Sequence, residues 1–235
     1  MPQPHVEPHA GASNSRLNAL RAAVLGANDG IVSVAGIVVG VAGATSSKSL
    51  ILTAGVAGIV AGALSMAAGE YVSVSSQRDS ERALLAKEKG ELRDFPKEEL
   101  AELEGLYQDK GLSATTAQQV AKELTAHDAF AAHAEAELKI DPNDLNNPWH
   151  AAIASALSFL VGAIIPLITI MLAPVSINVA VTFVAVLLAL TLTGLLSAHY
   201  GDANKMRATL RVVIGGAIAM AATYGIGTLV GIHGA

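Results

Sequence analysis

The fold of this chain is decided by residues 50–79, LILTAGVAGIVAGALSMAAGEYVSVSSQRD. The apolar part, 50–74, is long enough to cross a bilayer as a helix, because about 20 apolar residues span the hydrocarbon core. It carries Met66 and Glu70, which are four residues apart and therefore share one helical face. The stretch then continues without a break into charged sequence. A carboxylate inside a membrane segment is costly, so Glu70 is a candidate functional residue.

The composition of the whole chain is that of a membrane protein. Of 235 residues, 52% are hydrophobic and only 15% are charged, and the mean hydropathy is +0.48. Five stretches have the length of a membrane-crossing helix, namely 17–44, 50–74, 149–173, 177–198 and 212–232. We therefore predict an all-α integral membrane protein with five transmembrane helices and a cytosolic three-helix acidic bundle inserted between the second and the third.

Four regions follow along the chain. Residues 1–15 are polar and broken by prolines, which predicts a disordered tail without a cleaved signal peptide. Residues 16–74 hold the first two transmembrane helices, 75–147 the soluble insert, and 148–235 the last three transmembrane helices.

Basic residues predict the orientation, because Lys and Arg gather at the cytosolic ends of membrane helices. With the N-terminus and the insert in the cytosol and the C-terminus outside, Lys48 is the only Lys or Arg near a membrane border that lies outside. The short tail and the lack of eukaryotic sorting signals favour a bacterial inner (cell) membrane, with a vacuolar membrane as the alternative.

The insert is acidic and helical. Residues 75–149 hold 16 acidic and 9 basic side chains, a balance that argues against nucleic acid as a partner and favours a cationic one. Its first helix continues the second membrane helix, and its second opens at Pro96. The third is capped by Ser113 and runs to about Ile140.

Inside the membrane, Asp29 is the partner that we predict for Met66 and Glu70. The two helices run antiparallel, so Asp29 and Met66 lie at a similar depth and Glu70 lies one turn nearer the cytosol. The sequence NDG at 28–30 predicts a loosened helix there. Carboxylates attract divalent cations, and a thioether favours softer first-row metals. The alternatives are that Asp29 pairs with Arg21 or caps a kink, and that Met66 only fills the core.

The insert offers a second group of candidate ligands. Acids three residues apart project from one face of each of its first two helices, and such pairs hold divalent metals inside helical bundles. The third helix adds a histidine and two more acids. The candidates are Glu88, Glu91, Glu99, Glu102, His133, Glu135 and Glu137. The alternative is an acidic face exposed to water.

Several classes of chemistry are excluded or disfavoured. The chain contains no cysteine, so disulfides, thiolate metal sites and cysteine nucleophiles are ruled out. It also lacks an HExxH motif and a clear nucleophile–base pair. We therefore do not expect an enzyme.

Two motifs carry a family resemblance. GANDGIVS at 26–33 and ALSMAAGEYVSVSSQRD at 63–79, followed by an acidic insert and three more spans, resemble the vacuolar iron transporter family, which includes nodulin-21-like plant proteins. The match extends from about Arg16 to the end of the chain. The resemblance implies a homodimer with a metal pathway lined by the first two helices. It implies export of Fe²⁺, often Mn²⁺ too, from the cytosol in exchange for protons, without a prosthetic group.

The resemblance also implies ligand residues. The membrane aspartate and methionine of the family fall on Asp29 and Met66, and its cytosolic glutamates fall on Glu88, Glu91, Glu99, Glu102 and Glu137. Family members carry a methionine pair shortly before the last of these. This chain has His133 and Ala134 there, with Glu135 following, so His133 is a candidate ligand and the preference among Fe²⁺, Mn²⁺ and Zn²⁺ is open.

Two other functions fit the same residues. One is a Mn²⁺ exporter or an exporter of many divalent metals on the same scaffold. The other is a membrane-bound metal sensor or buffer, which would bind metal through the insert without moving it across the membrane.

Overall fold

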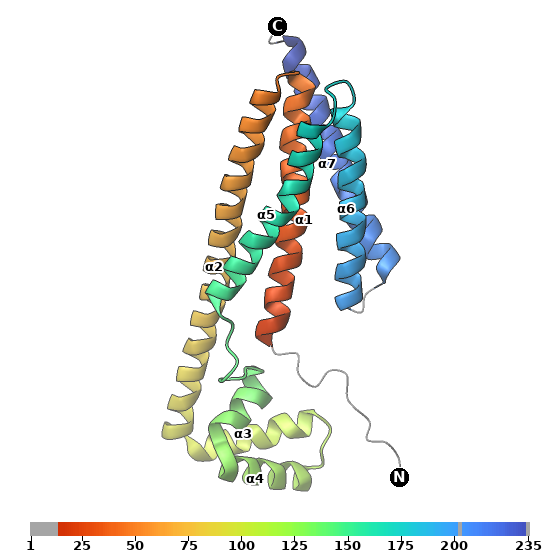
Figure 1. Cartoon of the computed structure of the whole chain (residues 1–235). Helices are drawn as coiled ribbons and strands as arrows, with labels where there is room; N and C mark the ends of the chain where they lie inside the picture. The colour runs from red at the N-terminus through yellow and green to blue at the C-terminus, as the bar shows by residue number, and fades with distance from the viewer. Residues whose placement is uncertain (1–13, 202–203, 234–235) are drawn as a thin grey trace, which may run out of the picture. The chain divides into compact units, whose positions relative to one another are not determined.

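The computed structural model describes residues 14–201 and 204–233, and over these residues the chain is helical and contains no strand (Figure 1). The elements in order are α1 (Asn14–Ala44), α2 (Lys48–Asp94), α3 (Pro96–Asp109), α4 (Ala114–His133), η1 (Ala134–Leu138), α5 (Pro148–Leu172), α6 (Asn178–Tyr200) and α7 (Lys205–His233). The all-α prediction is therefore confirmed. The first 13 residues of the predicted tail lie outside the described residues.

Five of the described helices are long and apolar enough to cross a membrane, as predicted. These spans are Asn18–Ala44, Lys48–Asp94, Pro148–Leu172, Asn178–His199 and Lys205–Gly231. The last begins earlier than its apolar run, which starts at Val212. The reason is a polar first turn: Asn204 accepts a hydrogen bond from the backbone N–H of Arg207 through Oδ1 at 3.0 Å, which caps the helix.

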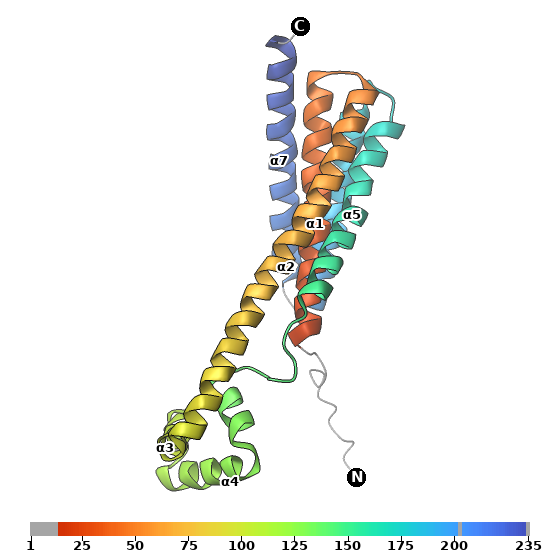
Figure 2. The same cartoon turned by 90° about the vertical axis from the view of Figure 1, so that its left-hand side faces the viewer.

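The chain divides into two compact units, and the larger comprises Asn18–Val72 and Pro148–Ala235. Within it, α1 lies against the other four helices (Figures 1 and 2). Its apolar side packs with α2 and α5 around Val38 and Phe159, and with α6 and α7 around Ile31 and Met220. Close approach needs small residues. A β-carbon at Gly30 would collide with the backbone carbonyl of Phe159.

This packing corrects one expectation. The sequence NDG predicted a loosened helix at Gly30, yet α1 is one helix from Asn14 to Ala44. The glycine serves the contact with α5 instead. The neighbouring Asn28 accepts a hydrogen bond from Thr193 of α6 at 2.8 Å, so two residues of this motif join helices.

One polar contact ties two helical hairpins together. Lys48 begins α2, and its Nζ donates to the carbonyl oxygens of Met171 at 2.7 Å and Ala173 at 3.2 Å. These carbonyls lie at the C-terminal end of α5, where helical carbonyls lack partners in the helix and a positive charge is favourable. The only basic residue that was predicted outside therefore caps a neighbouring helix.

The smaller unit contains residues 73–147. In it, α3 packs on α4 and η1 around a core of Leu103, Ala121, Ala132 and Ala136. Ser113 caps α4 by accepting the N–H of Thr116 at 3.3 Å, as predicted.

The third insert helix is not the single helix that was predicted. Its backbone breaks at Asp128, with φ −158° and ψ 94°, and its last turn, η1, is a π-helix. At the break, Asp128 Oδ1 accepts the N–H of Ala131 at 2.9 Å. Asp128 therefore acts as an N-cap that starts a new short helical segment.

Candidate metal site

The short segment 129–138 carries three of the predicted ligands, His133, Glu135 and Glu137. It begins after the Asp128 cap and ends at Lys139, whose φ of 55° is left-handed. The ammonium of Lys89 from α2 lies 4.4 Å from the centre of the Phe130 ring, a contact that holds the segment against α2. Short π-helical turns are frequent at functional sites. Here the turn follows His133 directly.

Four predicted ligands meet at this segment. His133 Nδ1 lies 3.1 Å from Glu88 Oε1, 3.6 Å from Glu99 Oε2 and 3.6 Å from Glu137 Oε2. One ligand atom from each of the four residues lies within 4.8 Å of the others. Glu88 comes from α2, Glu99 from α3, His133 from α4 and Glu137 from η1. We call Glu88, Glu99, His133 and Glu137 the insert cluster.

Three of the four residues of the insert cluster are buried, Glu137 is partly exposed, and the cluster is short of positive charge. His133 is 0% exposed and Glu88 2% exposed. Burial, together with the nearby carboxylates of Glu137 and Glu99, raises the pKa of Glu88 from 4.5 to about 7. Glu88 lies well beyond the apolar part of α2, which ends at Val74. Burial and the charge of Glu102 also raise the pKa of Glu99.

Several polar atoms of the insert cluster make no hydrogen bond of suitable geometry, even where a polar neighbour is close, although buried polar atoms normally make one. They are Glu88 Oε1, both ring nitrogens of His133, and Glu137 Oε2. A divalent cation among them would satisfy the oxygens and Nδ1 and would offset the carboxylate charge. Three carboxylates and one imidazole suit borderline first-row metals, because imidazole binds them readily and Ca²⁺ and Mg²⁺ prefer oxygen.

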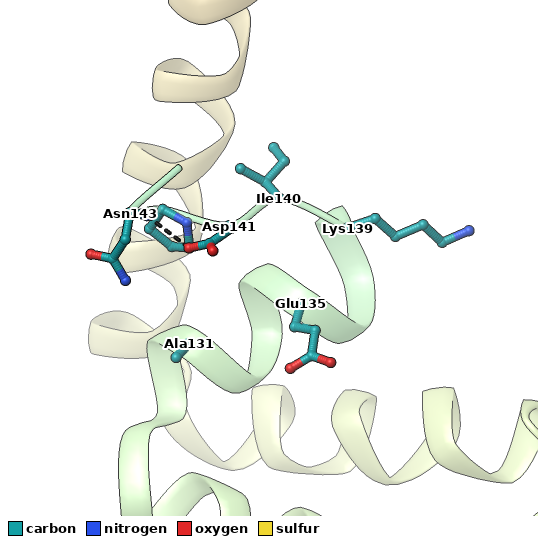
Figure 3. A pocket seen from close by; sticks show the side chains of 7 residues that line it. Ala131, Glu135, Lys139, Ile140, Asp141 and Asn143 are labelled. Atoms are coloured by element: carbon teal, nitrogen blue, oxygen red, sulfur yellow. Dashed lines mark hydrogen bonds between the residues drawn. The ribbon is translucent and has the colours of Figure 1, made fainter. Parts of the chain in front are cut away.

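The other predicted insert ligands lie elsewhere. Glu91 forms an ion pair with Lys87 at 3.0 Å, and Glu102 is exposed. Glu135 is also exposed and lines a separate pocket of about 470 Å³ next to Asp141 (Figure 3). These three remain predictions as ligands, outside the insert cluster.

The membrane candidates have their own partners. Asp29 is half-buried and accepts a hydrogen bond from Ser33 at 2.5 Å. Glu70 is 7% exposed and accepts one from Arg21 at 3.1 Å. Met66 packs against the apolar core that includes Phe159.

Sequence reasoning missed the pair of Arg21 and Glu70. Arg21 was weighed as a partner for Asp29, but in the structure its guanidinium binds Glu70. A signal was present, because Arg21 and Glu70 both lie near the predicted cytosolic ends of neighbouring antiparallel helices. Matching the depth of Arg21 as well as that of Asp29 would have found it.

Similar proteins are found along most of the chain. The family model described as VIT family matches residues 20–228. A vacuolar iron transporter of Acanthamoeba castellanii is 45% identical over 212 residues, which cover 89% of this chain and 78% of that protein. Vacuolar iron transporter homolog 1 of Oryza sativa subsp. japonica is 38% identical, over 94% of this chain and 77% of that protein. Homolog 4 of Arabidopsis thaliana is 36% identical, over 94% and 88%.

Proposed function

This chain belongs to the VIT family, and we propose that it carries Fe²⁺, and Mn²⁺ as well, out of the cytosol in exchange for protons. Family membership supports metal transport by a multi-pass membrane protein. The observation that carries the rest of the proposal is the insert cluster, whose four ligand atoms lie within 4.8 Å of one another. Its chemistry suits the capture of a divalent cation before transport.

The insert cluster has the properties of an exchangeable site. Metal binding requires deprotonated carboxylates. The pKa of Glu88, about 7, lies near the pH of a cytosol, so a proton and a metal ion compete for this carboxylate under working conditions. Such a site can load metal at neutral pH and lose it when protons are abundant.

From the cluster, we propose that the ion moves to Glu70, Met66 and Asp29. Support comes from the helix spacing that places Met66 and Glu70 on one face, and from the burial of Glu70. We propose that two copies of the chain meet along the first two transmembrane helices, which doubles the ligands of the pathway. Protonation of the membrane carboxylates on the acidic side would release the ion.

The orientation and the location are part of the proposal. The distribution of Lys and Arg supports an N-terminus and an insert in the cytosol, with the C-terminus outside. For the membrane, sequence reasoning favours a bacterial cell membrane, whereas the relatives carry vacuolar names. Microscopy of a tagged full chain in its source cell decides between the two.

Transport is tested by uptake of Fe²⁺ into proteoliposomes that hold the full chain under an imposed pH gradient. We expect uptake that depends on the gradient, competition by Mn²⁺, and loss of uptake in Asp29→Ala. Competition among Fe²⁺, Mn²⁺ and Zn²⁺ ranks the metals. Metal binding without uptake would reject transport and favour a sensor or buffer. Unchanged uptake in Asp29→Ala would reject the assignment of Asp29.

A further inference from the structure

The ion pair of Glu70 and Arg21 joins α1 to α2 at the end of the predicted pathway. Arg21 Nη2 lies 3.1 Å from Glu70 Oε2, and Arg21 Nε donates to Asn18 Oδ1 at 3.1 Å. Next to Glu70, the rings of Tyr71 and Trp149 contact each other in a tilted arrangement, with their centres 4.7 Å apart. Aromatic rings of this kind gather where membrane meets water. On the proposed topology, this places the pair near the cytosolic border of the membrane.

The two partners differ sharply in their exposure. The side chain of Glu70 is 7% exposed, and that of Arg21 is 55% exposed. A buried carboxylate requires a cationic or hydrogen-bonding partner. A guanidinium that keeps about half of its surface exposed beside the carboxylate is held less firmly than a buried one, so it can turn away at a smaller cost. The carboxylate is thus fixed and its present partner is exchangeable.

We propose that Arg21 is a tethered cation that occupies Glu70 until a divalent ion replaces it, and that it makes this step selective for divalent over monovalent ions. This inference rests on the proposed pathway through Glu70. A divalent ion and the guanidinium cannot share Glu70 Oε2, because like charges at contact distance repel strongly. A monovalent ion carries no more charge than Arg21 and must compete with a group that is already held beside the carboxylate.

The role differs from that of a structural ion pair. If Arg21 only braced the two helices, removing it would weaken the fold and the metal site together. If Arg21 competes with metal, removing it makes metal binding at Glu70 tighter and exposes this carboxylate to monovalent ions.

The test measures binding of Mn²⁺ to the full chain in detergent, with free Mn²⁺ followed by electron paramagnetic resonance. All variants carry Glu88→Gln and Glu99→Gln, which remove binding at the insert cluster. We expect Arg21→Gln to lower the Kd by up to about fivefold, the upper size expected for an exposed ion pair. We also expect 100 mM K⁺, about the concentration of a physiological salt, to weaken binding in Arg21→Gln more than in the parent.

Three further variants keep the test decisive. Arg21→Lys retains a tethered charge, so its Kd should stay close to that of the parent even if Arg21→Gln folds poorly. Arg211→Gln removes an exposed arginine elsewhere and should change nothing. Adding Glu70→Gln should abolish the gain caused by Arg21→Gln.

Two results would overturn the inference. One is unchanged or weaker Mn²⁺ binding in folded Arg21→Gln, and the other is a gain that persists with Glu70→Gln. The outcome is separate from transport, since no flux is measured. Tighter binding in Arg21→Gln would support the tethered cation even if uptake by the unaltered chain were absent.

Discussion

The buried acids of the insert and those of the membrane helices are balanced in different ways. In the insert cluster, three carboxylates surround one imidazole, and several of their atoms make no hydrogen bond. In the membrane helices, Glu70 has Arg21 and Asp29 has the hydroxyl of Ser33. The insert cluster thus lacks a cationic partner for its carboxylates, whereas each membrane carboxylate already has a partner in the structure. The partner of a buried acid therefore indicates whether the acid lacks a cation or already has one.

The largest effect is expected from Glu88→Gln. It removes one of four ligand oxygens and should weaken metal binding by more than about a hundredfold, since even outer partners of a metal site are worth 10–100-fold. Isothermal titration of the full chain with Mn²⁺ measures the change. Glu98→Gln is the matched control, because Glu98 is an exposed acid on the neighbouring helix and is not among the predicted ligands, and it should bind as the parent does. Equal losses of Mn²⁺ affinity in both variants would contradict the assignment of the insert cluster as the metal site.

The second prediction concerns the stability of the metal-free protein. The pKa of Glu88 is raised on folding from 4.5 to about 7. The protonated form of Glu88 therefore stabilises the fold fully below pH 4.5, and this contribution is lost as the pH rises through about 7. The free energy of unfolding should fall by a few kcal/mol over this range. Glu99 acts in the same direction.

Thermal unfolding followed by circular dichroism at pH 5 and pH 8 checks this sign. We expect a lower Tm at pH 8 without metal, and a recovery when Mn²⁺ is added. In Glu88→Gln the fall between the two pH values should shrink. If the metal-free protein were more stable at pH 8 than at pH 5, the idea that the cluster lacks positive charge would be wrong.

A smaller effect is expected from Asp128→Ala. Loss of the cap that starts segment 129–138 should cost about 1 kcal/mol and weaken metal binding several-fold, because His133 and Glu137 lie on that segment. Asp128→Asn should retain the cap and most of the affinity. Hydrogen exchange of the segment reports the local opening, and equal exchange in both variants would argue against the cap.

The smallest effect is expected from Glu70→Gln on stability. Arg21 is half exposed and water solvates it after the change, so unfolding should shift by no more than about 1 kcal/mol, although Fe²⁺ uptake should fall. Thermal unfolding in detergent measures the shift. A loss of stability as large as the one expected between pH 5 and pH 8 would contradict the proposed difference between the insert cluster and the membrane acids.

Much of the fold could be predicted because it depends on length and local chemistry. Apolar stretches of sufficient length become membrane helices, and Ser113 is a good helix cap wherever it stands. The continuation of α2 beyond Val74 was also predicted, through Arg93, and the helix ends one residue later at Asp94.

The composition of the insert cluster was harder to predict. Spacing shows that Glu88 and Glu91 share a face, but tertiary packing decides that Glu88 turns inward while Glu91 pairs with Lys87. The break at Asp128 and the π-helical turn after His133 also depend on packing. These two features decide which side chains of the third helix point inward. Only the structure therefore shows that Glu137 joins the cluster while Glu135 is exposed.

The contact of Lys48 with α5 has a consequence for biogenesis. Lys48 and Met171 are 123 residues apart, so a ribosome must synthesise the whole insert before their hydrogen bond can form. Until α5 has been made, the ammonium of Lys48 lacks these two carbonyl partners. Once the bond closes, withdrawal of either hairpin would strip a charge from its carbonyl partners. The bond can therefore form only after both hairpins have been made, and it then joins the start of α2 to the end of α5.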